Sequence, residues 1–113
     1  MHEMALSASV LRIIEEQAAA EGFRHVRSVV LEVGALAAVD PEALRFSFEA
    51  AARGGLAEGA RLEIEVPPGE AWCADCERTV TIDERIAPCP RCGAYGLKVT
   101  GGDQMRVREL EVD

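Results

Sequence analysis

The chain is poor in aromatic residues and in long apolar runs. It contains three phenylalanines, one tryptophan and one tyrosine among 113 residues, so a core must be built from Leu, Val, Ile and Ala. No apolar run approaches the roughly 20 residues that are needed to span a bilayer. The first residues also lack a basic region followed by an apolar one, and therefore no secretory signal is expected. These absences predict a cytoplasmic location and no membrane contact.

Positive charge is scarce as well. Twelve Lys and Arg residues face 20 Asp and Glu residues, which gives a formal net charge of −8. Phosphate backbones and anionic membranes repel such a chain. There are only two histidines and no glycine-rich phosphate loop. The composition therefore argues against nucleic-acid binding and against an enzyme.

The spacing of apolar residues predicts two helices and three main strands. Asp40 is a good N-cap and Pro41 suits the first position of the second helix. The last strand changes phase at Arg108 and Glu109, which indicates a bulge or kink. The apolar stripe of the first helix is expected to be Met4, Val10, Leu11, Ile14 and Ala18. The predicted elements are a helix over 4–20, a strand over 26–33, a helix from Asp40 to Gly54-Gly55, and strands over 61–66 and 105–112.

Four cysteines form two C-x₂-C pairs, Cys73 with Cys76 and Cys89 with Cys92, which are separated by twelve residues. Two tight turns of this kind supply the four tetrahedral thiolates that zinc prefers. Disulfides fit a reducing compartment poorly, and a redox C-x-x-C should open a helix after a strand, which neither pair does. Iron in a four-thiolate site is the remaining alternative. Because four thiolates leave no position for water, the predicted zinc is structural.

Glycine and proline surround the cysteine segment. Pro67-Pro68-Gly69 precedes it and Gly101-Gly102 follows it, and both are interpreted as hinges. Short strands are expected inside the segment at 79–82 and 97–100, and Gly93 is expected to have a positive φ. The fold class is therefore α/β (α+β), with a small sheet of about three strands packed with two helices. The predicted domains are 1–66 plus 103–113, an α/β domain, and 67–102, an inserted zinc-ribbon module.

The N-terminal residues Met1, His2 and Glu3 form a possible chelating group. The α-amine, the amide nitrogen of His2 and its imidazole can bind one metal in fused rings, and Glu3 can add an amide or carboxylate ligand. Such nitrogen-rich sets suit Ni(II) or Cu(II). Spacing alone, however, favours an ordinary exposed histidine at position 2.

Taken together, these features resemble the HypA/HybF family of hydrogenase maturation nickel metallochaperones. The resemblance covers the segments M-H-E-M-A-L-S, V-V-L-E-V-G, F-S-F-E-A, both C-x-x-C pairs, and G-D-Q-M-R-V-R-E-L-E-V. It implies that Met1, His2 and Glu3 bind nickel and that Cys73, Cys76, Cys89 and Cys92 hold a structural zinc. It also implies that Ni(II) is delivered to the large subunit of nickel–iron hydrogenase with a GTPase partner of the HypB type. Some members of the family also serve urease maturation.

Two further residues have no settled role. His25 is the only other histidine, and the resemblance places no additional metal ligand there. Asp40 corresponds to an acidic residue that is implicated in some members, but it also serves as the predicted helix cap. The alternative function is an acidic zinc-ribbon module that makes protein contacts and binds no nickel.

Overall fold

The computed structural model describes residues 2–113, so Met1 lies outside the described residues. The chain forms two compact units. We call residues 2–31, Val39–Ile64 and Arg106–Asp113 the helix–sheet unit, and Glu32–Ala38 with Glu65–Met105 the ribbon unit. The ribbon unit thus includes residues 32–38, which the sequence placed in the α/β domain. The predicted domain boundaries remain a proposal.

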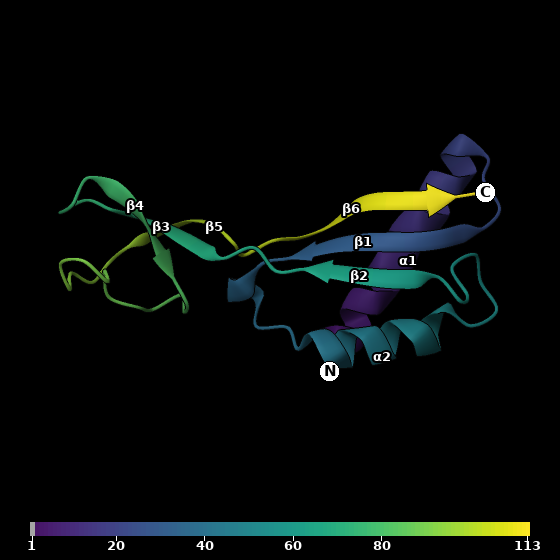
Figure 1. The fold of residues 1–113 in the computed structure, drawn as a ribbon, viewed down its shortest axis with the longest axis horizontal. Coiled ribbons are helices and arrows are strands. Elements are labelled where there is room, and N and C mark those ends of the chain that lie inside the picture. Colours follow the sequence, from purple (N-terminus) through teal and green to yellow (C-terminus); the bar gives the residue numbers. More distant parts are fainter. Residues whose placement is uncertain (1) are drawn as a thin grey trace. The chain divides into compact units, whose positions relative to one another are not determined.

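The helix–sheet unit combines two helices with one three-stranded sheet (Figure 1). Its strands lie in the order β2-β1-β6. The helices are α1 (His2–Glu21) and α2 (Pro41–Ala52), and the strands are β1 (Val26–Val33), β2 (Arg61–Glu65) and β6 (Met105–Val112). This arrangement confirms the predicted fold class of two helices and a small sheet, with the ribbon as a second sheet.

The first helix differs from its prediction at the N-terminal end. It begins at His2, so the second and third residues belong to its first turn and do not form a tail before it. Val10, Ile14 and Ala18 are buried as expected, but Met4 is 50% exposed. Met4 was therefore wrongly placed on the core face. Asp40 caps α2 as predicted, because its Oδ1 accepts hydrogen bonds from the amides of Glu42 (3.0 Å) and Ala43 (3.5 Å).

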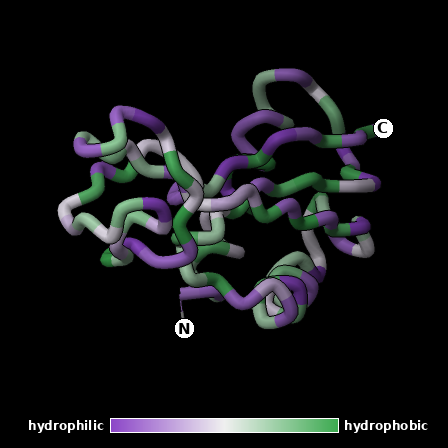
Figure 2. The backbone as a smooth tube through the Cα atoms, turned by 60° about the vertical axis from the view of Figure 1, so that its left-hand side comes forward, coloured by the Kyte–Doolittle hydropathy of each residue, from purple (hydrophilic) through white to green (hydrophobic). Residues whose placement is uncertain are grey.

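The strands bury alternate residues. In β1 the side chains of Val29, Leu31 and Val33 are buried, and hydrophobic and hydrophilic segments alternate along the tube of Figure 2. In β6 the alternation changes phase where predicted, since Arg108 and Glu109 are both exposed. Phe48 and Leu44 of α2 are at most 1% exposed and complete the core of this unit.

The ribbon unit contains the second sheet, whose strands are antiparallel and lie in the order β4-β3-β5. The sequence predicted its outer strands within one residue but did not predict β3, which follows directly after the prolines. A short 3-10 helix also lies in this unit. These elements are β3 (Gly69–Cys73), β4 (Arg78–Ile82), β5 (Lys98–Gly101) and η1 (Ala35–Ala37).

Three segments of the ribbon unit are bonded to one another next to Gly34. The amides of Gly34, Ala35 and Leu36 donate to the carbonyls of Gln104, Pro67 and Gly102, at 2.9, 2.9 and 2.8 Å respectively. A Cβ atom on Gly34 would lie 2.1 Å from the carbonyl oxygen of Gly102, so only glycine allows this approach. Pro67 and Gly102, which were interpreted as hinge residues, are thus both hydrogen-bonded here.

Candidate metal centre

The four cysteine sulfurs form one compact cluster. Their ligand atoms all lie within 4.8 Å of one another. The Sγ atoms of Cys73 and Cys92 are 3.7 Å apart, and those of Cys76 and Cys89 are 3.9 Å apart. A tetrahedral zinc with bonds of about 2.3 Å requires sulfur–sulfur distances of roughly 3.8 Å. A disulfide requires about 2.05 Å, and all four cysteines are free.

Two similar turns place these sulfurs. Each pair is followed by a residue with positive φ, Glu77 at 52° and Gly93 at 77°. Gly93 thus has the predicted conformation, whereas Glu77 adopts it with a side chain that disfavours it. In the second turn the amide of Gly93 donates to the carbonyl of Cys89 at 2.8 Å, and the amide of Arg91 donates to the Cys89 sulfur at 3.4 Å. Backbone hydrogen bonds of the second turn therefore help to fix the position of the Cys89 sulfur.

The cluster is part of the hydrophobic core of the ribbon unit. Cys73 and Cys89 are 1% and 2% exposed, whereas Cys92 is exposed. Leu36, Ala71, Val80 and Ile82 pack in the same cluster of buried residues. Leu36 comes from η1, far from the cysteines in sequence, and its role was missed. The only sequence signal was an apolar A-L-A segment after a strand, which also suits a surface turn.

The thiols of the cluster differ in acidity. Hydrogen bonding from the backbone of Cys92 lowers the pKa of Cys89 to about 7. Hydrogen bonding with the Cys92 thiol raises the pKa of Cys76 to about 12. One thiol is therefore ready to bind metal near neutral pH, while another must release its proton to the solvent when the metal binds. Metal binding by such a set is opposed by acid.

The predicted N-terminal site lies at the start of α1, with Met1 outside the described residues. His2 is exposed and Glu3 is partly buried. A carboxylate oxygen of Glu3 accepts a hydrogen bond from the amide of Asp40 at 3.2 Å, and this bond lowers the pKa of Glu3. The structure thus brings together two residues that are 37 positions apart. The sequence singled out both residues but did not predict that they meet.

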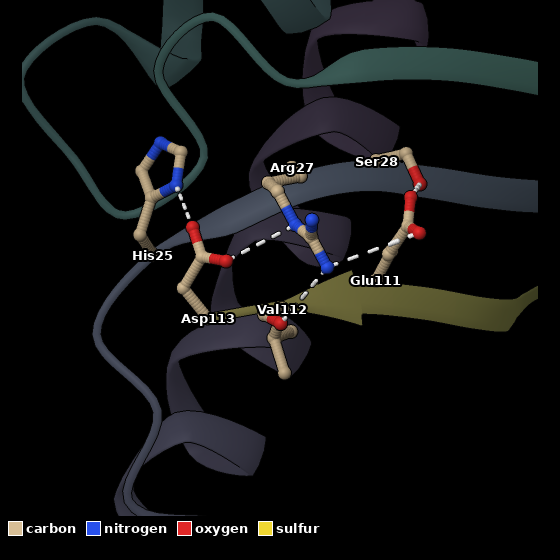
Figure 3. A network of polar contacts seen from close by, with 6 residues as sticks. All are labelled: His25, Arg27, Ser28, Glu111, Val112 and Asp113. Carbon is tan, nitrogen blue, oxygen red and sulfur yellow. Dashed lines mark hydrogen bonds and ion pairs between the residues drawn. The ribbon is translucent and has the colours of Figure 1, made fainter.

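The second histidine belongs to a different group of side chains (Figure 3). His25 Nδ1 lies 3.3 Å from Asp113 Oδ2, and Arg27 Nε lies 3.1 Å from Asp113 Oδ1. Glu111 accepts a hydrogen bond from Ser28 at 3.1 Å. This network joins the start of β1 to the end of β6. It gives His25 a structural partner and leaves the four-cysteine cluster without a histidine.

Among residues 2–113, neither helix is both long and apolar enough to cross a membrane.

Comparison with known proteins places these features in one family. Residues 1–112 match the family model described as hydrogenase/urease nickel incorporation, metallochaperone, hypA. A hydrogenase maturation factor HypA from Rhodopseudomonas palustris is 58% identical over 113 residues, covering 100% of both chains. The factor of the same name from Azotobacter vinelandii is 53% identical, again with 100% coverage of both.

A solved structure agrees with this assignment. The solution structure of the Ni metallochaperone HypA from Helicobacter pylori has a TM-score of 0.72 and 25% sequence identity, covering 97% of this chain and 96% of that one.

Proposed function

Because the chain belongs to the HypA family of hydrogenase/urease nickel-incorporation metallochaperones, we propose that it binds Ni(II) through Met1, His2 and Glu3. In this proposal the chain delivers the ion during maturation of nickel–iron hydrogenase. It is a carrier and not an enzyme. The free cysteines suit the reducing cytoplasm, which is its proposed location.

The observation that carries the nickel site is the position of His2 in the first turn of α1. The first amides of an α-helix have no acceptor within the helix. The amides of His2 and Glu3 can therefore be deprotonated and bind nickel without the loss of an intrahelical hydrogen bond. The exposed imidazole of His2 lies on the same residue. Nitrogen ligands of this kind suit Ni(II), and copper should compete for them.

The contact between Glu3 and Asp40 suggests different roles for the side-chain carboxylate and the backbone amide of Glu3. Its carboxylate is engaged with the Asp40 amide, which fastens the start of α1 to the start of α2. We assign its backbone amide to nickel, and nickel binding would replace the hydrogen bond that this amide makes with the Glu3 carboxylate. Each ligand nitrogen competes with protons, so acid should release the ion.

The four cysteines would hold zinc, with Cys73, Cys76, Cys89 and Cys92 as its only ligands. A site filled by four thiolates has no place for a reactive water, so zinc there would not be catalytic. Its proposed role is to cross-link the segments that carry the cysteines. The cross-link joins the end of β3 to the turn at residues 89–92. We therefore assign the zinc a structural role.

The proposed partners are a GTPase of the HypB type, the hydrogenase large subunit and, because the matched family serves nickel incorporation into hydrogenase and urease, urease maturation proteins. We expect the GTPase to contact the start of α1, where nickel would be handed over. A footprint of the GTPase confined to residues 73–92 would contradict this placement.

The test is calorimetric titration of nickel into untagged, zinc-loaded protein. The His2→Ala variant removes the proposed ligand, and His25→Ala is its matched control because the chain has only two histidines. We expect one nickel per chain for the native protein and the control, and loss of binding in His2→Ala. Equal binding by both variants would exclude this site. No binding by the native protein would leave an acidic zinc-ribbon interaction module.

A further inference from the structure

Two sulfur–sulfur contacts in the cysteine cluster each join an accessible cysteine to a buried one. Cys92 is exposed, and its sulfur lies 3.7 Å from that of the buried Cys73. Cys76 is partly buried, and its sulfur lies 3.9 Å from that of the buried Cys89. Both contacts run between the two turns. A small oxidant that enters from solvent would therefore meet Cys92 first and Cys76 next.

This arrangement suits reversible oxidation of the cysteines. An accessible thiolate is the one that peroxide oxidises, and a neighbouring thiolate can trap the resulting sulfenic acid as a disulfide before it is oxidised further. Cysteines that hold a metal are thiolates, which is also the reactive form. Each contact of the cluster thus combines an accessible sulfur with a sulfur that can resolve it.

We propose that hydrogen peroxide converts the cluster into two disulfides, Cys73–Cys92 and Cys76–Cys89, with release of the zinc on whose structural assignment the proposal rests. The Cys92 thiolate attacks one peroxide oxygen, the O–O bond breaks and hydroxide leaves, so that Cys92 becomes a sulfenic acid. The Cys73 thiolate then attacks the Cys92 sulfur, and a second hydroxide leaves. Two sulfurs lose two electrons, one peroxide is reduced, and two protons from solvent convert both hydroxides to water.

The second pair consumes a second peroxide in the same way, with Cys76 as the accessible sulfur and Cys89 as the resolving one. Two peroxides thus oxidise all four cysteines of the chain. Zinc binds thiolates and not disulfide sulfurs, so the loss of these ligands releases the ion. Thiols reduce disulfides by exchange, which makes the change reversible.

Disulfides within the turns, Cys73–Cys76 and Cys89–Cys92, are the alternative. A redox pair of this spacing opens a helix after a strand, whereas Cys73 ends β3 and pairs with Arg78 of β4 across its turn. Disulfides between the turns instead join the same two segments that zinc would join. The ribbon unit should therefore stay folded when it is oxidised, although it loses the metal.

The experiment treats untagged, zinc-loaded protein with one and then two equivalents of hydrogen peroxide. A chromogenic chelator measures the released zinc, and the remaining thiols are alkylated before the disulfides are mapped by mass spectrometry. Trypsin and a protease that cleaves before aspartate place every cysteine on its own peptide. Their cleavage sites include Asp75 between the first two cysteines, Arg78 between the pairs and Arg91 between the last two.

At one equivalent we expect Cys73–Cys92 as the main disulfide, because Cys92 is the exposed sulfur. At two equivalents we expect both disulfides between the turns, the release of one zinc per chain and retention of the near-ultraviolet dichroism. A thiol reductant with added zinc should restore the starting protein.

Two controls accompany this experiment. Protein oxidised in denaturant shows which disulfides the separation of the cysteines along the chain favours by itself, and an identical pattern in the native protein would overturn the proposal. Met4, which is 50% exposed, reports unspecific oxidation and should stay unmodified while the disulfides form.

Three other results would also overturn the proposal: disulfides within the turns, cysteines oxidised to sulfonic acids, and zinc that is retained once the peroxide is consumed. Metal analysis before oxidation distinguishes this proposal from the zinc assignment. A chain that takes up no zinc contradicts the assignment and the release together, whereas a zinc-loaded chain that forms other disulfides contradicts only the proposed oxidation.

Discussion

Removal of the metal should unfold the ribbon unit and leave the helix–sheet unit folded. The core cluster around the cysteines contains four buried apolar residues besides them, of which Leu36, Val80 and Ile82 are the larger. Burial of these three side chains contributes about 1.5–3 kcal/mol each. Ordering a residue costs about 1–2 kcal/mol, and the unit spans Glu32–Ala38 and Glu65–Met105. Apolar burial alone is far too small to hold it.

Zinc bound by four thiolates contributes about 10–16 kcal/mol in small domains, which is comparable with the whole stability of a folded domain, about 5–15 kcal/mol. The helix–sheet unit has its own core, in which Ile14, Leu31, Leu44 and Phe48 are at most 1% exposed. Loss of the metal should therefore affect the two units very differently.

The single tryptophan makes this prediction measurable. Trp72 lies in β3 of the ribbon unit, and the single tyrosine, Tyr95, belongs to the same unit. Because Trp72 is already 41% exposed, its emission should shift to the red only slightly when a chelator removes the metal at neutral pH, whereas its near-ultraviolet dichroism should disappear. The helical far-ultraviolet signal of α1 and α2 should persist. A metal-free protein with native near-ultraviolet dichroism would refute the reasoning.

Three further predictions concern two single substitutions and one titration. Glu77→Gly should stabilise the zinc-loaded protein by about 1 kcal/mol, because Glu77 has a φ of 52° that glycine adopts without strain; chemical denaturation measures the gain, and a loss of stability would contradict it. Gly34→Ala should destabilise the protein by about 2–4 kcal/mol, since its Cβ would lie 2.1 Å from a backbone oxygen, whereas the control Gly55→Ala meets nothing closer than 3.6 Å. The Asp40 amide donates to Glu3, whose pKa is lowered, so its nuclear magnetic resonance shift should titrate with a midpoint below 4.5. This contact stabilises the fold above the ordinary glutamate pKa and is lost as the pH falls through the lowered one; a midpoint at or above the ordinary value would show that the bond does not form in solution.

The sequence predicted the elements whose patterns are local. The two helices, β1, β2, β6 and the cysteine turns follow from periodicity, capping and spacing, and the structure agrees on all of them. Strand β3 was missed because its buried positions, Gly69, Ala71 and Cys73, are small and follow two prolines. Leu36 was missed because its partners are distant in sequence. The exposure of Met4 depends on how α1 packs, which periodicity alone does not determine.

In the candidate site too, local features could be predicted from the sequence and contacts between distant segments could not. The set of four cysteines could be named from spacing, but the contact between Glu3 and Asp40 requires α1 and α2 to be packed together. The start of α1 at His2 also escaped prediction, because a helix pattern is weakest in its first turn. That detail matters most for the proposed function, since it decides which amides are available to nickel.

The most direct test of the account is X-ray absorption at the nickel edge of protein that holds one zinc and one nickel. We expect a first shell of nitrogen and oxygen only, because nickel would bind at the start of α1 while the cysteines keep their zinc. Sulfur in the nickel shell would contradict it and would place the ion at the cysteine cluster instead.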